Sequence, residues 1–558
     1  MDIGTNGKGM NSLLSLASGY AEFIERLQNK HLFGKFGYYL QRKMLGKNTC
    51  GAYGSEFLRK VSEKRLQLDF PDYPDEEPLD VRLYLKKNTP FSSHLKSREP
   101  VVKFLKESIT HNISLACVPF YEVITDQIEQ IPLHLLRLCS NGMCAGNTAK
   151  ESLIQGICEI FERHAMRELY ERDLTPPNIP RELLNEAGVL EKIQKIEKDF
   201  NTTVLIKDMS LGVGLPVAGC IFIYHDSDTY NVCIGSDANP ITAVERCLTE
   251  AYQGMDGKGG REQPVHHLKS DDDDKLYNFR RNLTFLDSHW PKSLFSSEPS
   301  WQFTGFSHPV STSDDDDLNY LVHLIREKGW HLYVRDVSFM GFPAFKIHIP
   351  EIGDINSWQE LEWRLSMKDS LTLLNVRQSS TEDLKNAAES LEKSSQSPTF
   401  QFQSIFPPHI NQELKSLSFN YFMALLFYRI GNPGRAFSYM DRYIREREET
   451  SGTFDKKSYM LCIREFFKMR ADSYRFSRIE KELPLLYGKK MGEMVLDAFS
   501  IPAHIFNSLK LPSCFQCSRC NIKDDCRFFD IQAIEKNIQD IQQQNPIDQD
   551  QLRKVFRA

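Results

Sequence analysis

The sequence predicts a large mixed α/β domain followed by a C-terminal α-helical domain, and three observations lead to that prediction. Up to about residue 392, helical patterns of apolar residues alternate with short runs of β-branched and aromatic residues. A polar stretch in which Ser and Gln recur then spans residues 390–403 and indicates a boundary. Beyond this stretch, apolar residues recur at helical spacing, which favours helices to about residue 507.

The first domain is expected to contain both helices and strands. The expected helices span residues 13–30, 150–171 and 243–253. The expected strands span residues 203–206, 216–224, 230–234, 331–335 and 344–348. Two acidic runs, Asp271–Asp274 and Asp314–Asp317, consist of like charges that repel one another, so we predict an exposed loop for each.

The second domain is predicted to open with a helical hairpin. Residues 411–430 and 433–449 have helical patterns, and Gly431 and Pro433 break the chain between them. Small residues on both helices and a glycine at the turn resemble one tetratricopeptide-type hairpin. The expected domains are residues 1–392, residues 393–507, and residues 508–558 with four clustered cysteines and a terminal helix.

Composition narrows the class of protein. The 558 residues carry 69 Lys and Arg against 75 Asp and Glu, so the basic surplus of a dedicated nucleic-acid binder is missing. No apolar run reaches the roughly 20 residues that a membrane helix needs, and the first residues show no secretory signal. We therefore expect a cytoplasmic protein without direct nucleic-acid or membrane partners.

Four of the 13 cysteines lie together near the C-terminus. Cys514, Cys517, Cys520 and Cys526 form the pattern C-x2-C-x2-C-x5-C, whose thiolates can bind one Zn²⁺ or an iron–sulfur cluster. The alternative is an unligated set, which would expose four thiols to oxidation. The sequence predicts a metal site here and leaves zinc and iron–sulfur open.

A short helical pattern, E-x-x-E-R, occurs twice. The two copies are Glu22, Glu25 and Arg26, and Glu159, Glu162 and Arg163. A degenerate third copy contains Arg246 and Glu250. Glutamates three residues apart project from one face of a helix, and two such charges are costly unless a cation compensates them.

Two interpretations of this pattern are open. The first is a pair of acidic residues on a helix surface. The second is nucleotide and metal binding, because the flanking residues are apolar and each copy follows a glycine-containing polar loop, at residues 5–9 and 140–148. Hard Mg²⁺ takes carboxylate oxygens, and glycine loops let backbone amides approach a phosphate. The loops are not Walker A motifs, because G-x-x-x-x-G-K-[ST] does not occur.

Together these motifs resemble those of the YcaO family, whose members are ATP-dependent enzymes that modify peptide backbone amides. The similarity runs from about residue 3 to residue 350. It includes TNGKG with AEFIER, SNGMCAGNT with CEIFER, and GSDANPITAVERCLTEAYQG. The helical C-terminal region resembles the arm of long, enterobacterial-type members, which are described as accessory factors for methylthiolation of a small-subunit ribosomal protein.

The resemblance implies roles for matching positions. It implies that Mg²⁺ ions bridging the ATP triphosphate are held by Glu22, Glu25, Glu159 and Glu162. It implies that the nucleotide pocket is lined by Lys8, Asn147, Glu151, Arg163, Arg246 and Glu250. No nucleophile or other reacting side chain can be assigned from spacing, since such residues are adjacent in space and not in sequence.

The implied reaction begins when a nucleophile adds to an amide carbonyl of a peptide or protein substrate. The resulting oxyanion attacks the γ-phosphate of ATP, and loss of phosphate gives an azoline, amidine or thioamide. The chain ends KVFRA, without the proline-rich terminus of azoline-forming members, which favours thioamide-type or accessory chemistry. Such chemistry implies a sulfur-delivery or methylthiotransferase partner.

The sequence also departs from the family pattern. It begins only a few residues before TNGKG, whereas family members carry several dozen upstream residues with an opening strand. This departure motivates a competing hypothesis, a non-catalytic YcaO scaffold that recruits partners through its helical arm. Cys144 stands where the enterobacterial proteins have Ser. The substrate peptide, the nucleophile and the oligomeric state, including a homodimer, are not determined by the sequence.

Overall fold

The computed structural model describes most of the chain, with several gaps. The described residues are 12–30, 73–110, 115–132, 140–227, 229–250, 263–264, 275–285, 288–306, 313–354, 367–396, 400, 402, 417–451, 457–507, 509, 511, 520, 523–525 and 528–557. Those between 12 and 354, together with those from 537 onward, form one compact unit, here called the α/β unit. Those between 367 and 536 form a second, the helical unit. The fold class expected from the sequence is confirmed.

The first sheet of the α/β unit is antiparallel. Its strand order is β1-β2-β9-β10-β4, and β3 pairs with the other edge of β2. The strands are β1 (Glu77–Pro78), β2 (Ala116–Glu122), β3 (Gln127–Pro132), β4 (Met143–Ala145), β9 (Tyr333–Asp336) and β10 (Ala344–His348). In register, Phe345 of β10 lies opposite Cys144 of β4 and Asp336 of β9.

The second sheet is also antiparallel and has the order β5-β6-β7-β8. The strands are β5 (Thr202–Asp208), β6 (Val217–Tyr224), β7 (Thr229–Ser236) and β8 (Gln263–Pro264). Each of the five expected strands is present as β5, β6, β7, β9 or β10, with shifts of a few residues at the ends. The sequence did not predict β1, β2, β3, β4 and β8.

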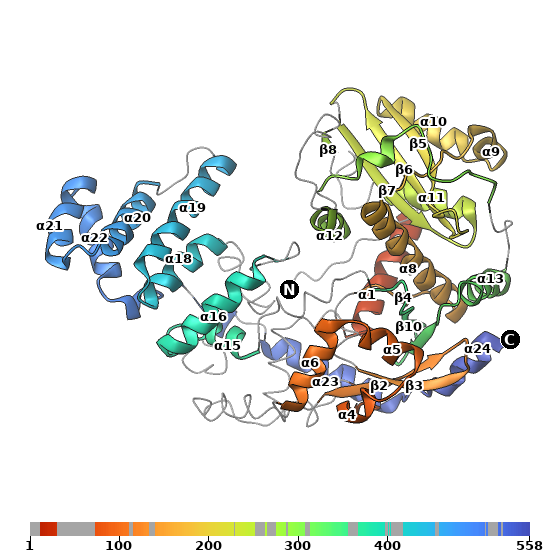
Figure 1. The fold of residues 1–558 in the computed structure, drawn as a ribbon, viewed down its shortest axis with the longest axis horizontal. Helices are drawn as coiled ribbons and strands as arrows, with labels where there is room; N and C mark the ends of the chain where they lie inside the picture. Colours follow the sequence, from red (N-terminus) through yellow and green to blue (C-terminus); the bar gives the residue numbers. More distant parts are fainter. Residues whose placement is uncertain are drawn as a thin grey trace. The chain divides into compact units, whose positions relative to one another are not determined.

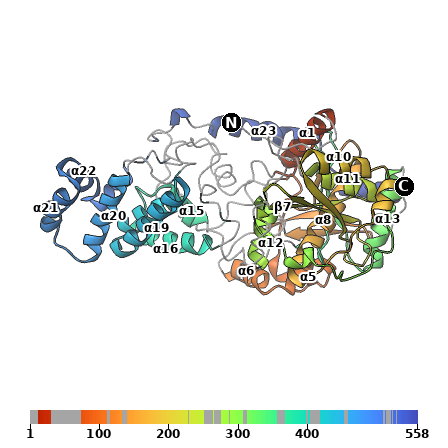
Figure 2. The ribbon, with the colours of Figure 1, turned by 90° about the horizontal axis from the view of Figure 1, so that it is seen from above.

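A long central helix, α8 (Ala149–Arg172), lies between the two sheets (Figure 1). It contacts β4 and β10 on one side and β6 and β7 on the other; Figure 2 shows it from above, beside β7. Leu153, Ile157 and Phe161 are fully buried in the core that α8 shares with the sheets. Thr148 caps its first turn by accepting a hydrogen bond from Glu151 N.

Further helices cover the sheets. They are α1 (Ser12–Gln28), α4 (Val81–Tyr84), α5 (Pro90–Lys96), α6 (Glu99–Thr110), α9 (Arg181–Glu186), α10 (Leu190–Asp199), α11 (Pro240–Glu250), α12 (Lys275–Phe285), η2 (Lys292–Phe295), α13 (Asp314–Glu327), η7 (Gln549–Gln551) and α24 (Leu552–Arg557). None of the described helices, in either unit, is both long enough and apolar enough to cross a bilayer.

One of the two acidic runs is not a loop. Asp314–Asp317 form the first turn of α13, and Ser313 caps this helix by accepting a hydrogen bond from Asp315 N at 3.2 Å. The prediction of a loop was wrong because carboxylates at a helix N-terminus interact favourably with its dipole, which offsets their mutual repulsion. The other run, Asp271–Asp274, lies outside the described residues.

The helical unit confirms the expected hairpin of helices. Its helices are α15 (Met367–Leu374), α16 (Thr381–Ser394), α18 (Phe419–Arg429), α19 (Pro433–Ser451), α20 (Lys457–Ala471), α21 (Phe476–Tyr487), α22 (Lys489–Phe499) and η4 (Pro502–His504). Gly431 adopts a φ of +83° between α18 and α19, and Ala424 and Ala436 are fully buried at their contact. The expected domain boundary at residue 392 falls inside α16. η6 (Lys523–Asp525) and α23 (Phe528–Gln544) come next along the chain. The helical unit ends at Lys536, and residues from Asn537 onward belong to the α/β unit.

Candidate functional site

The first E-x-x-E-R copy lies at the C-terminal end of α1. Glu25 is 6% exposed and Glu22 is half-buried. Arg26 lies between the two carboxylates, with Nη2 at 3.5 Å from Glu22 Oε1 and Nη1 at 3.4 Å from Glu25 Oε1. The guanidinium therefore provides positive charge that a buried acidic pair needs.

Hydrogen bonds to the β9–β10 connection, residues 337–343, hold the end of α1 in place. Gln28 is fully buried; its Nε2 donates to Phe342 O at 2.9 Å, and its Oε1 accepts from Met340 N at 2.8 Å. Asn29 Nδ2 donates to Phe345 O at 3.4 Å. Because Glu25 lies one helical turn before Gln28, these bonds also hold the backbone that carries Glu25.

The two motif helices bring one carboxylate each into electrostatic range. Burial raises the pKa of Glu25 to about 8; the charge of Arg26 lowers it, and the charges of Glu159 and Glu22 raise it further. Glu159 lies on α8, so the interaction joins the first and second copies of the motif. Cys144 of β4 is fully buried beside them, and burial together with the charges of Glu25 and Glu159 raises the pKa of its thiol.

The remaining members of the second copy lie one turn further along α8. The side chain of Glu162 is mostly buried, and its Oε1 lies 3.9 Å from Nε of the neighbouring Arg163. This pairing repeats that of Glu25 with Arg26 on α1. In both copies the arginine lies beside the second glutamate of its motif.

The loop before α8 brings Asn147 and Glu151 together at the start of the helix. Asn147 donates to the Glu151 carboxylate from its backbone N at 2.9 Å and from Nδ2 at 3.1 Å. Gly142 has a φ of +75°, and a Cβ on it would lie 2.2 Å from Ile347 O, so this position requires glycine. Gly142 O accepts from Ile347 N at 2.6 Å, which fixes the loop against β10.

The third motif lies on α11, which packs against β6 and β7 of the second sheet. Arg246 of α11 lies with Nη1 3.7 Å from Asp237 Oδ2. Burial raises the pKa of Asp237, whereas Arg246 lowers it. Burial raises the pKa of the Cys158 thiol on α8; the charge of Asp237 raises it further and the charge of Arg246 lowers it.

Several predicted site residues cannot be placed. Lys8, Cys514, Cys517, Cys526 and the side chain of Glu250 lie outside the described residues. Cys520 is half-buried and packs against the core of the helical unit. Among the side chains that the structure does describe, no three from His, Cys, Asp and Glu are grouped so as to hold one metal ion.

The structure adds residues that sequence reasoning missed. Lys346 of β10 is 7% exposed, donates from Nζ to Asn141 O at 2.7 Å, and lowers the pKa of Glu25 by its charge. A lysine within the apolar strand sequence AFKIH was a signal that could have identified it, because buried lysines are rare without a specific partner. Asp237 and Gln28 gave no comparable signal.

Comparison with known proteins places these motifs in one family. Residues 6–353, more than half of the chain, match the family model described as YcaO cyclodehydratase, ATP- and Mg²⁺-binding. The chain is 27% identical over 367 residues to the ribosomal protein S12 methylthiotransferase accessory factor YcaO of Escherichia coli, covering 64% of this chain and 58% of that protein. It is 25% identical over 381 residues to an uncharacterized protein of Haemophilus influenzae, covering 65% and 61%.

The chain thus spans about three fifths of the length of these curated relatives. Among solved structures, it is similar to a heterocyclase in complex with substrate and cofactor. That likeness has a TM-score of 0.40 at 18% identity and covers 62% of this chain and 44% of the other.

Proposed function

The chain belongs to the YcaO family, and we propose that it is an ATP- and Mg²⁺-dependent enzyme, or catalytic accessory factor, that activates a backbone amide of a peptide or protein. The observation that carries this proposal is the buried carboxyl of Glu25 on α1, 3.4 Å from the arginine of its motif, whose raised pKa responds to the charge of Glu159 on α8. Carboxylates buried at such cost are typical of sites that bind a cation or act in chemistry.

The donor chemistry fits Mg²⁺, which prefers carboxylate oxygens. Mg²⁺ ions would be held by Glu22, Glu25, Glu159 and Glu162. Because no three described acidic side chains are grouped around one point, each ion would take one or two of these carboxylates. When bound, Mg²⁺ neutralises charge on the triphosphate and on the phosphoryl group during transfer. In the protein without bound Mg²⁺, Arg26 and Lys346 supply the positive charge near Glu25.

The side chains that the family resemblance assigns to the nucleotide pocket would orient the nucleotide. They are Lys8, Asn147, Glu151, Arg163, Arg246 and Glu250. Asn147 and Glu151 already bind each other at the exposed start of α8, where backbone N–H groups favour an anion. Phosphoryl transfer depends mainly on positioning and charge neutralisation, so the proposal needs no nucleophilic side chain in this set.

The proposed reaction has two bond exchanges. A nucleophile adds to the amide carbon, and the carbonyl oxygen, now an oxyanion, attacks the γ-phosphorus of ATP while the bond to ADP breaks. The carbon–oxygen bond then breaks, inorganic phosphate leaves, and the amide becomes a thioamide, azoline or amidine. The name of the E. coli relative supports an accessory role with a methylthiotransferase partner. Thioamide-type chemistry and a sulfur-delivery partner are part of the proposal on the sequence resemblance. The α18–α19 hairpin, as a tetratricopeptide-like arm, is the proposed partner-binding region.

Isothermal titration with MgATP tests this function. We expect wild type to bind MgATP and Glu159→Ala to bind it at least tenfold more weakly. Mutating even a residue that only orients a metal ligand typically lowers metal affinity about 10- to 100-fold. Glu171→Gln, an exposed position on α8, is the matched control and should bind like wild type. A wild type that binds no MgATP, or a Glu159→Ala variant that binds normally, contradicts the proposal.

Product release separates an enzyme from a scaffold. Peptide-dependent release of phosphate and ADP eliminates the scaffold alternative. Binding of MgATP without any such release, in the presence of the natural substrate and partner, favours the scaffold.

For the cysteine segment we propose a site for Zn²⁺ or an iron–sulfur cluster. Support comes from the C-x2-C-x2-C-x5-C spacing alone. Metal analysis and visible absorption of anaerobically purified protein distinguish the two outcomes. Loss of the metal in Cys514→Ser is expected, and a metal-free wild type contradicts the proposal.

A further inference from the structure

The last residues of the chain fold against the α/β unit. Leu552 is 2% exposed and belongs to the core that also contains Phe161 of α8 and Ile347 of β10. Val555 and Phe556 pack against the same core. The C-terminal segment, here residues 548–557, is therefore part of the α/β unit although it lies far beyond the family match at residue 353.

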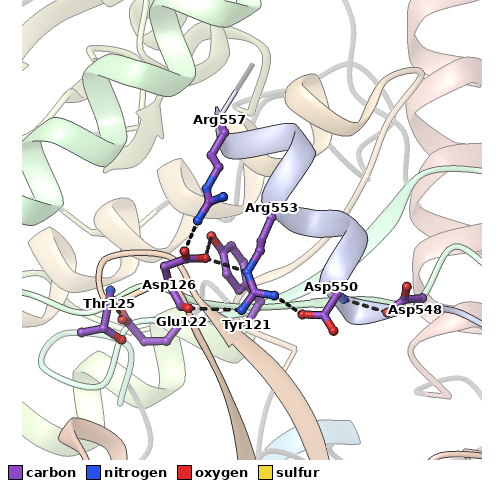
Figure 3. Close-up of polar contacts among 8 residues, drawn as sticks. All are labelled: Tyr121, Glu122, Thr125, Asp126, Asp548, Asp550, Arg553 and Arg557. Carbon is purple, nitrogen blue, oxygen red and sulfur yellow. Dashed lines mark hydrogen bonds and ion pairs between the residues drawn. The ribbon is translucent and has the colours of Figure 1, made fainter.

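An aspartate in the β2–β3 turn anchors this segment. Figure 3 shows Arg553 and Arg557 of α24 pointing toward Asp126, which has a φ of +57°. Arg553 Nε lies 2.7 Å from Asp126 Oδ1, Arg557 pairs with Oδ2, and Tyr121 donates its hydroxyl to Oδ1 at 3.0 Å.

Within the C-terminal segment, Asp548 caps η7 by accepting a hydrogen bond from Asp550 N at 3.0 Å. Such exposed pairs are individually weak, so the anchor depends on their number and on the buried Leu552.

A second contact reaches the end of a central strand. Gln549 is 5% exposed; its Oε1 accepts from Asp336 N at 2.8 Å, and its Nε2 donates to Asp336 O at 3.0 Å. Asp336 is the last residue of β9. Since one side-chain amide satisfies both backbone groups, it holds the strand end in one orientation.

From Asp336 the chain continues directly into the β9–β10 connection. Ser338 N donates to Asp336 Oδ1 at 2.8 Å, and Gly146 N donates to Pro343 O at 3.1 Å. Gln28 of α1 binds the connection between these points, at Met340 N and Phe342 O. The connection is thus joined through Asp336 to Gln549 at one end, and it contacts the helix of Glu25 in its middle and the loop before α8 at its other end.

We propose that Gln549 is a positioning residue for the carboxylate site. By fixing Asp336 it fixes the β9–β10 connection, which in turn holds Gln28 and therefore the last turn of α1 with Glu25. The C-terminal segment would then set how strongly Mg²⁺ supports nucleotide binding. This inference rests on the proposed function for its Mg²⁺ readout.

The test compares Gln549→Ala with Gln551→Ala, an exposed neighbour whose side-chain amide donates to Asp548 and is not bonded to Asp336. ATP binding is measured over a range of Mg²⁺ concentrations and in EDTA. For Gln549→Ala we expect the Mg²⁺ concentration at half-maximal binding to rise about tenfold, as for other residues that orient metal ligands, and binding in EDTA to be unchanged. Gln551→Ala should match wild type.

A structural role alone would lower the melting temperature of Gln549→Ala and leave the Mg²⁺ midpoint of the folded protein unchanged; that result overturns the proposal. If Gln549→Ala does not fold, Arg553→Ala is the alternative variant, because it weakens only the exposed anchor at Asp126. It should raise the Mg²⁺ concentration at half-maximal ATP binding by less than tenfold. An unchanged midpoint in Arg553→Ala then overturns it.

Hydrogen exchange separates the positioning role from the proposed function. Amides in the last turn of α1 should exchange faster in Gln549→Ala than in wild type without any nucleotide. Unchanged exchange there overturns the positioning role. A wild type that binds no MgATP, by contrast, overturns the proposed function, and faster exchange in α1 would still support the link from Gln549 to that helix.

Discussion

The carboxylate of Glu25 on α1 lies within electrostatic reach of the carboxylate of Glu159 on α8. Like charges that interact around a buried carboxyl destabilise its ionised form unless a cation compensates them. The elevated pKa of Glu25, about 8, follows mainly from its burial. A cation that binds there must displace a proton at neutral pH, which makes cation binding dependent on pH.

Binding of MgATP should therefore tighten as pH rises. Below a pH of about 8, Glu25 is mostly protonated, and releasing its proton costs roughly tenfold in affinity per pH unit. We expect the dissociation constant to fall by about tenfold per unit from pH 6 to 8 and to level off above it. Isothermal titration in buffers of different ionisation enthalpy measures both the affinity and the proton released.

Variants of Lys346 test whether Glu25 causes the pH dependence of MgATP binding. Because the charge of Lys346 lowers the pKa of Glu25, Lys346→Met should move the levelling-off to higher pH, whereas Lys346→Arg should not. An affinity for MgATP that is independent of pH from 6 to 9 would show that Glu25 is already ionised in the unliganded protein.

The same carboxyl should limit stability at alkaline pH. Its pKa is about 8 when folded against an ordinary value of 4.5, so the folded state binds more protons between these values and loses stability as pH rises through that window. Glu25→Gln should raise the free energy of unfolding by on the order of 2–4 kcal/mol at pH 9 and change it little at pH 4. Urea denaturation at both values measures the difference.

Glu171→Gln serves as the control for this substitution, since Glu171 is exposed on α8. It should leave the unfolding free energy unchanged at both pH values. A Glu25→Gln variant that is destabilised at pH 9 would mean that the ionised carboxylate gains more from Arg26 than it loses by burial.

Many of the helices and strands around Glu25 and Glu159 were predictable from the sequence. Runs such as residues 216–224 are apolar and bounded by turn residues, and they form β6 and its neighbours as expected. The spacing of the E-x-x-E-R copies placed their glutamates on helices, and they lie on α1 and α8. In each case the evidence is local, because helix and strand periods are properties of adjacent residues.

What the sequence could not show depends on contacts between distant residues. Strand β2 was missed because Pro119 lies within it, and proline normally argues against a central strand. The bonds from Gln549 to Asp336 join positions that no periodicity relates. Lys346 became a site residue only when β10 was placed beside α1. Long-range pairing of this kind is decided by the tertiary fold.

The loop before α8 should tolerate no side chain at Gly142. Its φ is +75° and a Cβ would lie 2.2 Å from Ile347 O, so Gly142→Ala combines backbone strain with a steric clash. We expect a loss of roughly 3 kcal/mol or more in unfolding free energy. Gly341→Ala is the control: its φ is +78°, but no atom lies within 4 Å of the added Cβ, so it should cost only about 1 kcal/mol. Equal losses in both variants would mean that φ alone determines the cost.

In the helical unit, two glycines should respond to alanine in opposite directions. Gly492 of α22 lies against Pro484 of α21, where a Cβ would approach Pro484 Cα to 2.6 Å. Gly492→Ala should therefore push the two helices apart and cost roughly 1–3 kcal/mol, because overpacking at a close helix contact forces backbone shifts. Gly434 of α19 is exposed and has only Asn432 Oδ1 nearby, at 3.8 Å, so Gly434→Ala should add up to about 1 kcal/mol through helix propensity. Thermal denaturation of the full-length variants measures both effects. Stabilisation of Gly492→Ala would show that α21 and α22 can separate without loss of packing, in contrast to the close contact between them.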